Sequence, residues 1–191
     1  MELTAPLAPQ LADLVGAYFN PLIRALHAFP KPILMAVNGV AAGAGANLAL
    51  AGDICIARQS ASFLQAFVHI GLLPDSGGTY FLPRAVGTAR ALAAAMLGEK
   101  ISAQAAADMG MIYQAVADDA FDAAVAAVAN KLAALPTRAL ITIRHALRAG
   151  GGLDAQLDME LDLQTQLAAT ADCTEGVQAF LGKRRAVFTG A

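Results

Sequence analysis

The sequence predicts an α/β protein with a helical C-terminal region. Short apolar runs of strand length alternate with helical patterns over residues 1–117, and from residue 118 onward the pattern is helical only. With 57% hydrophobic and 15% charged residues, the 191-residue chain is too apolar for a disordered segment. We therefore expect an α/β core over residues 1–117 and a helical subdomain over residues 118–191.

The first elements of the core follow from hydrophobic spacing. Residues 11–28 carry apolar side chains at helical spacing, and two prolines end this helix. Residues 33–37 form a continuous apolar run, which is typical of a strand buried on both faces. We expect a loop of small residues over 38–45, followed by a short helix over 47–51.

The rest of the core alternates in the same way. Residues 53–57 indicate a strand, and residues 62–64 are a candidate for another. A dense turn signal over 74–78 precedes a helical segment that reaches Gly98. A further helix opens at residues 101–104 and is closed by a glycine, and the strand predicted next covers residues 111–116.

From residue 118 the helical pattern is interrupted at Pro136 and at the three glycines 150–152. The formal net charge is −2, and the only basic run is Lys183–Arg185, which argues against a nucleic-acid surface. The two cysteines, Cys55 and Cys173, lie far apart without a CxxC spacing, so neither a disulfide framework nor a metal site is indicated.

Composition also bears on where the protein acts. The N-terminus lacks the basic-then-apolar order of a signal peptide. Residues 33–52 are long enough to cross a bilayer, but their crowded glycines favour a turn over a continuous helix. We expect a cytoplasmic protein that binds neither nucleic acid nor membrane.

Gly43-Ala44-Gly45 follows a predicted strand and opens a predicted helix. The spacing does not continue as GxGxxG, and no acidic residue stands where a ribose would need one, so a dinucleotide site is not indicated. Two readings stay open and about even: close packing of strand and helix, or helix amides that stabilise a developing oxyanion.

Pro74-Asp75-Ser76-Gly77-Gly78 also has two readings. Its Asp-Ser-Gly-Gly is like the nucleophile motif of trypsin-like proteases, but the alanine-rich helical pattern opposes a β-barrel. Asp75 is then either an N-cap for the helix after Gly77 or a catalytic carboxylate, and the residues alone favour the cap.

Taken together, these motifs resemble the enoyl-CoA hydratase/isomerase (crotonase) superfamily. The resemblance is carried by residues 31–53, 71–79, 82–87, 98–108 and 175–184. It implies a crotonase-like fold, a spiral of ββα units with a helical C-terminal trimerisation subdomain. It also implies an acyl-CoA thioester as substrate, no separate cofactor because CoA is part of that substrate, and a homotrimer or a dimer of trimers.

Within the superfamily, the residues at three positions distinguish hydratases from isomerases. Two positions that hold glutamates in hydratases hold Asn47 and Phe67 here, while Asp75 stands where several isomerases and dehalogenases place an aspartate. The segment Tyr18-Phe19-Asn20-Pro21-Leu22 and the Asn47/Asp75 pair are similar to the branch that isomerises ring-epoxidised phenylacetyl-CoA in phenylacetate degradation. An acyl-CoA isomerase is therefore expected, with an enoyl-CoA hydratase-type lyase as the alternative.

On this resemblance the catalytic residues are Asp75, which moves a proton, and Ala44, whose amide stabilises the enolate oxygen. The residues expected to bind substrate are Gly43, Asn47, Phe67, Leu72, Phe180 and Lys183.

Family members have further N-terminal strands, which supply a second oxyanion amide, and this sequence begins inside that pattern. We therefore expect a partial core that lacks the N-terminal part of the fold. A further alternative is a shortened, inactive paralogue that assembles with full-length subunits.

Overall fold

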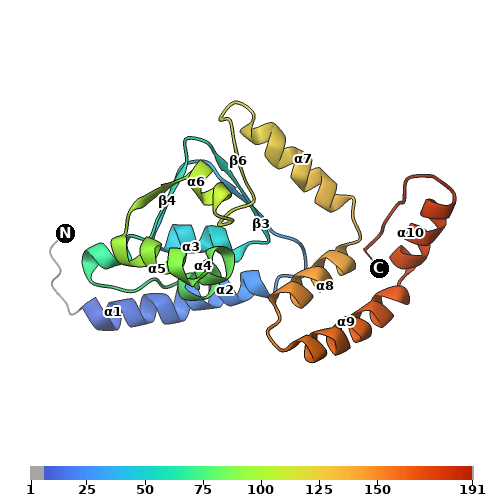
Figure 1. Cartoon of the computed structure of the whole chain (residues 1–191), viewed down its shortest axis with the longest axis horizontal. Coiled ribbons are helices and arrows are strands. Elements are labelled where there is room, and N and C mark those ends of the chain that lie inside the picture. The colour runs from blue at the N-terminus through green and yellow to red at the C-terminus, as the bar shows by residue number, and fades with distance from the viewer. Residues whose placement is uncertain (1–6, 191) are drawn as a thin grey trace. The chain divides into compact units, whose positions relative to one another are not determined.

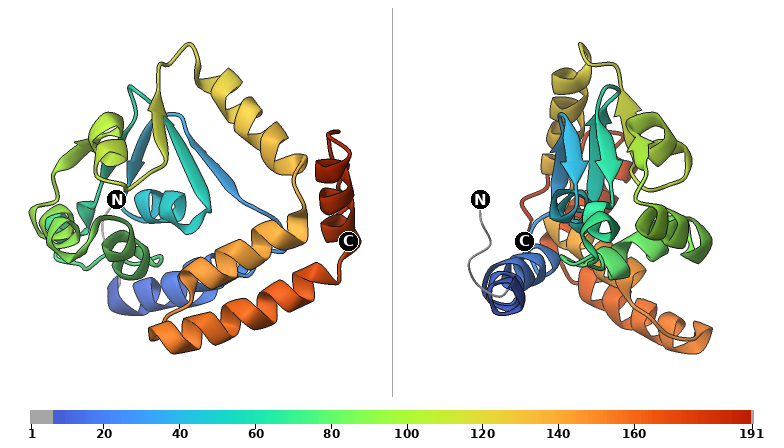
Figure 2. Two further views of the ribbon diagram at one scale, coloured as in Figure 1. Left: turned by 45° about the vertical axis from the view of Figure 1, so that its right-hand side comes forward. Right: turned by 90° about the vertical axis from the view of Figure 1, so that its left-hand side faces the viewer.

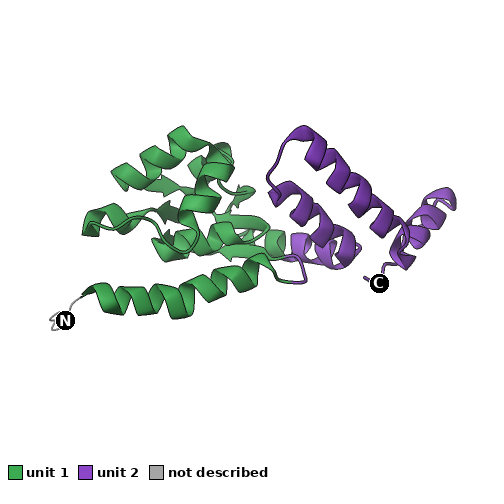
Figure 3. Ribbon diagram, turned by 90° about the horizontal axis from the view of Figure 1, so that it is seen from below, with its two compact units in different colours: residues 1–29, 33–125 green, residues 30–32, 126–191 purple. Residues whose placement is uncertain are grey.

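The computed structural model describes residues 7–190, and the chain divides into two compact units (Figure 3). The first holds the residues up to 29 together with 33–125, and the second holds 30–32 together with 126–191. The division falls inside α7 (Phe121–Ala133), not before it at residue 118. The start of α7 belongs to the first unit because Phe121 is buried there. The Cζ atom of Arg58, in the first unit, lies 5.0 Å from the centre of the Phe121 ring.

Two three-stranded sheets form the centre of the first unit (Figure 2). One sheet has the order β1 (Leu34–Val37), β3 (Ile54–Arg58), β6 (Gln114–Val116), with all strands parallel. The other has the order β2 (Val40–Ala42), β4 (Ser62–Leu64), β5 (Lys100–Ser102), parallel in the first pair and antiparallel in the second. The predicted strands over 33–37, 53–57 and 62–64 are confirmed to within a residue.

The N-terminal helical rod differs from a plain helix. It consists of α1 (Leu7–Leu14), a π-helical segment η1 (Val15–Phe19) and α2 (Asn20–His27) (Figure 1). The helix predicted over 11–28 is confirmed in type, but among the described residues it begins at Leu7 and its hydrogen bonding changes in the middle.

Several shorter elements depart from the predictions. The expected loop over 38–45 contains β2, and α3 (Ala44–Ala51) begins three residues earlier than predicted. The single helix expected before Gly98 is two helices, α4 (Gly78–Val86) and α5 (Thr88–Leu97), because Gly87 between them has a φ of 78°. The 3-10 helix η2 (Ala66–Ile70) and β5 were not predicted, and α6 (Ala103–Asp108) leads to the third strand of the first sheet.

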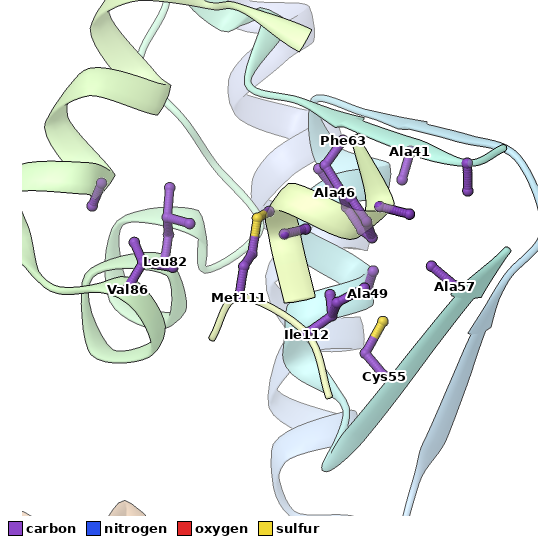
Figure 4. Packing of buried hydrophobic residues seen from close by; sticks show 14 residues of the cluster. Ala41, Ala46, Ala49, Cys55, Ala57, Phe63, Leu82, Val86, Met111 and Ile112 are labelled. Carbon is purple, nitrogen blue, oxygen red and sulfur yellow. The ribbon is translucent and has the colours of Figure 1, made fainter. Parts of the chain in front are cut away.

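The buried core of this unit is built mainly from alanines (Figure 4). Ala46 and Ala49 place one face of α3 against Ala41 and Ala57 of the sheets, and Phe63 is the largest side chain that is fully buried. Small side chains let a helix approach a strand closely, which explains how an alanine-rich chain buries a continuous core. Met111 and Ile112 also lie in this cluster, but their N–H groups donate to the Ala106 carbonyl of α6 and not to a neighbouring strand. β6 therefore begins at residue 114 and not at 111 as predicted.

The second unit contains α8 (Thr137–Arg148), α9 (Leu153–Ala168) and α10 (Ala171–Leu181). The breaks predicted at Pro136 and at glycines 150–152 are confirmed. An unpredicted break at Thr170 is capped, because the Thr170 Oγ1 accepts the Cys173 N–H at 3.1 Å.

The residues after α10 are bound back onto it. Asp172 accepts the Thr189 and Gly190 N–H groups, and Glu175 forms a bidentate pair with Arg184.

Within the described residues, no single helix is long and apolar enough to cross a membrane. Only α7 and α8 taken together have the length and apolar composition of a span, and they are bent by 103° at the break between them. Within residues 7–190, no three His, Cys, Asp or Glu side chains are grouped so that they could hold a metal ion.

Candidate active site

A cavity of about 530 Å³ opens in the first unit between the N-terminal rod and the loop that precedes α4. Its volume lies in the range of small-molecule sites. One wall is apolar and comes from Ala8, Leu11 and Ala12 of α1 together with Val15. The remaining lining residues are Asn20, Leu72, Leu73, Pro74, Asp75, Ser76, Gly77 and Thr79.

Asp75 brings the carboxylate of this cavity. The residue is half-buried, and its Oδ1 accepts a hydrogen bond from the Ser76 hydroxyl at 2.9 Å. Its side chain does not cap α4: the N-cap is Gly77, which has no side-chain cap hydrogen bond, and Asp75 receives the Gly78 N–H on its backbone carbonyl at 2.8 Å. The capping role that the residues alone favoured is therefore wrong, and the carboxylate belongs to the cavity wall.

The backbone of Asp75 is also held from the interior of the unit. The Asn47 side-chain amide donates to the Asp75 carbonyl oxygen at 2.8 Å, and the Asn47 carbonyl accepts the Gln65 amide, also at 2.8 Å. Asn47 and Gln65 are 0% and 1% exposed. Asn47 has no exposed surface with which to contact a substrate. Its side chain binds the backbone of Asp75 and thereby positions that residue, in contrast to the direct substrate contact that was expected.

Gln65 was missed at the sequence level. Its function depends on Asn47, which lies 18 residues earlier in the chain, so no local pattern identifies it. The only signal was an amide residue within the buried segment that follows β4, since a buried amide needs hydrogen-bond partners.

The start of α4 packs directly on this amide pair. A Cβ added at Gly78 would overlap the Asn47 carboxamide. Glycine at this position lets the α4 backbone approach Asn47 closely, and it thereby fixes the distance between α3 and the loop that carries Asp75.

The first turn of α3 holds the predicted oxyanion donor. Gly43 has a φ of 54° and donates its N–H to the Leu64 carbonyl at 2.8 Å, which anchors the turn to the end of β4. The Ala44 N–H forms no hydrogen bond with any of residues 7–190. The first N–H groups of a helix have no partner within it and lie at the positive end of its dipole, so this amide suits a negatively charged oxygen.

Phe67 lies beside this turn. It is buried, and its ring would be 3.7 Å from a Cβ built on Gly43. Asn47 lies three positions after Ala44 on α3, a rise of about 4.5 Å along the helix axis. The Ala44 amide is therefore within one helical turn of the residue that holds the Asp75 loop.

The structure thus brings some of the predicted residues together and not others. Leu72 and Asp75 share the cavity, whereas Gly43, Ala44 and Phe67 gather at the start of α3 outside its lining. The assignment of these residues to the substrate stays a prediction. So does that of Phe180 and Lys183, which belong to the second unit; Phe180 is 83% exposed.

Comparison with known proteins gives consistent matches. A family model described as enoyl-CoA hydratase/isomerase matches residues 4–191. The chain is 49% identical to the 1,2-epoxyphenylacetyl-CoA isomerase of Escherichia coli strain K12 over 96% of its own length and 71% of that protein's length. It is 53% identical to a Rhodobacter capsulatus protein named "Probable enoyl-CoA hydratase", over 90% of this chain and 68% of that one.

The backbone is similar as well. The crystal structure of an enoyl-CoA hydratase from Bacillus anthracis superposes with a TM-score of 0.91 at 31% identity, and the match covers 96% of this chain and 71% of the other.

Proposed function

The chain belongs to the enoyl-CoA hydratase/isomerase family and has its crotonase-like α/β fold, and we propose that it is an acyl-CoA isomerase that uses Asp75 to transfer a proton. Enzymes of this family act on CoA thioesters and need no cofactor. The observation that carries the proposal is that Asp75 lines a cavity of ligand size while its backbone is held by α3, the helix that begins at the Ala44 amide.

The proposed reaction is a proton relocation. The Asp75 carboxylate removes a proton from the acyl chain, and the electrons of that C–H bond move into the thioester to form an enolate. The Ala44 N–H donates a hydrogen bond to the enolate oxygen, which is a stronger acceptor than the thioester oxygen of the substrate. Asp75 then returns the proton to another carbon, so the double bond has moved and the carboxylate is ionised again.

Isomerisation fits these residues better than hydration does. Addition of water across a double bond needs an acid and a base that act on the water molecule. The two positions at which the family resemblance places hydratase glutamates hold Asn47, an amide with both ends hydrogen-bonded, and Phe67, a buried hydrocarbon ring. Neither residue can accept a proton from water.

The finer assignments are part of the same proposal. The substrate we infer is a ring-1,2-epoxyphenylacetyl-CoA, which is supported by the similarity to the Escherichia coli isomerase and by the apolar α1 wall of the cavity. In this substrate the ring C–C bond shared with the epoxide breaks to give a seven-membered cyclic ether. Asp75 moves the proton from the side-chain CH2 group to a ring carbon, so no atom is gained or lost. We further infer that Phe180 and Lys183 contact CoA, that the helical second unit mediates trimer formation, and that the enzyme acts in the cytoplasm.

Enzyme assays of the purified chain test the function. We expect isomerisation of cis-3-hexenoyl-CoA or of ring-1,2-epoxyphenylacetyl-CoA, and no appreciable hydration of crotonyl-CoA. Rapid hydration without isomerisation would favour the hydratase alternative. A chain that neither binds nor converts any acyl-CoA would favour an assembly role with other subunits.

A further inference from the structure

The segment Tyr18–Leu22 has no role in the reaction as proposed, yet the structure gives it an unusual geometry. Residues 15–19 are π-helical, and the Asn20 N–H donates to the carbonyl oxygen of Val15, five residues earlier. Single π-turns inside longer helices are uncommon and frequently occur at functional sites. Figure 1 shows that the rod formed by α1 and α2 passes through this turn without a break in direction.

The π-turn decides which side chain faces the cavity. Ala8, Leu11, Ala12 and Val15 line it at the three- and four-residue spacing of an α-helix. Continued α-helical spacing would bring residues 18 and 19, both aromatic, to the same face. The extra residue of the π-turn instead brings Asn20 to the face of Val15, and Asn20 is the next residue of the rod that lines the cavity.

Asn20 is the polar group on the rod side of this cavity. The other lining residues from the rod are Ala8, Leu11, Ala12 and Val15, all apolar, and Asp75 lies on the opposite loop. Among residues 7–190, none forms a hydrogen bond with the Asn20 carboxamide. The side chain does not cap α2 either, because the N-cap of that helix is Phe19.

A carboxamide can both donate and accept a hydrogen bond, and it carries no charge. In a cavity that closes around a ligand, such a group loses water and needs a partner from the ligand. The chemistry that fits is an oxygen atom on the acyl group, remote from the thioester: a hydroxyl, a carbonyl or an epoxide oxygen.

We propose that Asn20 is a specificity residue that binds an oxygen substituent on the acyl group, placed in the cavity by the π-turn at residues 15–19. The inference rests on the proposed acyl-CoA function and deepens it, because it selects oxygenated acyl groups over plain hydrocarbon ones. A site built to hydrogen-bond a substrate oxygen discriminates strongly against analogues that lack it.

Binding measurements on two unreactive probes test this role without depending on turnover. The dissociation constants of 2-hydroxyphenylacetyl-CoA and phenylacetyl-CoA are measured by calorimetry for the wild-type chain, for Asn20→Leu and for Asn130→Leu. Leucine keeps the branching of the side chain at Cγ but has no hydrogen-bonding group. Asn130 is an exposed asparagine of α7 outside the cavity, so its variant is the matched control.

We expect the wild type and Asn130→Leu to bind the hydroxylated probe about tenfold more tightly than phenylacetyl-CoA, as expected for one hydrogen bond gained on binding. In Asn20→Leu this preference falls to within twofold while phenylacetyl-CoA binds as before. The proposal is overturned if the wild type shows no preference, if the preference survives in Asn20→Leu, or if both probes weaken equally.

The two proposals fail in different ways. A wild-type chain that shows the Asn20-dependent preference but isomerises no substrate overturns the isomerase assignment and leaves the Asn20 contact in place. A chain that binds neither probe overturns both.

Discussion

The side-chain amide of Asn47 donates a hydrogen bond to the backbone carbonyl of Asp75 across 2.8 Å. The contact joins two segments 28 residues apart, and Asn47 is itself held by Gln65 at the end of β4. A positioned carboxylate is effective only if its loop keeps one conformation, since catalytic geometry must be held closely. The amide pair supplies this restraint from inside the core.

Removing the tether is expected to lower both stability and activity. In Asn47→Ala, the Gln65 amide and the Asp75 carbonyl both lose a buried partner, and we expect the free energy of unfolding to fall by roughly 1–3 kcal/mol. Urea denaturation measures this loss, and steady-state kinetics should show a lower kcat. Asn130→Ala, on an exposed face of α7, should change neither. An Asn47→Ala enzyme with undiminished kcat would show that the Asp75 loop holds its conformation without the tether.

Gly78 should tolerate no side chain. Alanine there overlaps the Asn47 carboxamide, which cannot move without losing its two hydrogen bonds, so Gly78→Ala should destabilise by about 1–3 kcal/mol. Gly45, in the first turn of α3, has no atom within 4 Å of an added Cβ. Gly45→Ala should therefore stabilise slightly, by about 0.5–1 kcal/mol. Equal midpoints of thermal unfolding for the two variants would contradict the close approach of α4 to Asn47.

The two cysteines should differ in reactivity. Burial raises the pKa of the Cys55 thiol to about 12, whereas Cys173 is exposed. Because the thiolate is the reactive form, Cys55 should stay inert at pH 8. Titration with Ellman's reagent should detect one thiol per native chain and two in urea. Rapid reaction of Cys55 in the native protein, located by mass spectrometry, would mean that the core around β3 opens readily.

The C-terminal tail should respond to acid. Hydrogen bonds from Arg184 and from the Val187 N–H lower the pKa of Glu175 from 4.5 to about 2. A lowered carboxyl pKa stabilises the bound tail above pH 4.5, and this stabilisation is lost as the pH falls from there toward 2. The protection of the Val187 amide, measured as its hydrogen-exchange rate relative to that of an unstructured amide at the same pH, should fall over that window. Glu175→Gln should show the low protection already at neutral pH; unaltered protection would indicate that Asp172 alone holds the tail.

The elements that form long apolar runs could be predicted from the sequence, whereas the short elements could not. β1 and β3 were predicted correctly because each is a continuous apolar segment. β2 and β5 each have three residues and exist through pairing with β4, which no local pattern encodes. The π-turn at residues 15–19 could not be predicted, because the apolar residues on both sides of it keep the spacing of an ordinary α-helix.

The candidate site shows the same division. Asp75 stands out in a turn motif and in a family resemblance, yet the residues alone favoured a helix cap. Only the structure shows that Gly77 occupies the cap position and that Asp75 lines a cavity. Gln65 and the positioning role of Asn47 depend on contacts between segments 18 and 28 residues apart in the chain, which no local sequence pattern encodes.

The most direct test of the central claim is the kcat of Asp75→Asn for isomerisation, measured beside its affinity for the acyl-CoA substrate. Asparagine keeps the shape of the side chain and removes the carboxylate that accepts the proton. We expect kcat to fall by roughly 10²–10⁴-fold with binding nearly unchanged, while Asp119→Asn, at an exposed position before α7, retains full activity. An Asp75→Asn enzyme that isomerises as fast as the wild type would contradict the claim that this carboxylate moves the proton.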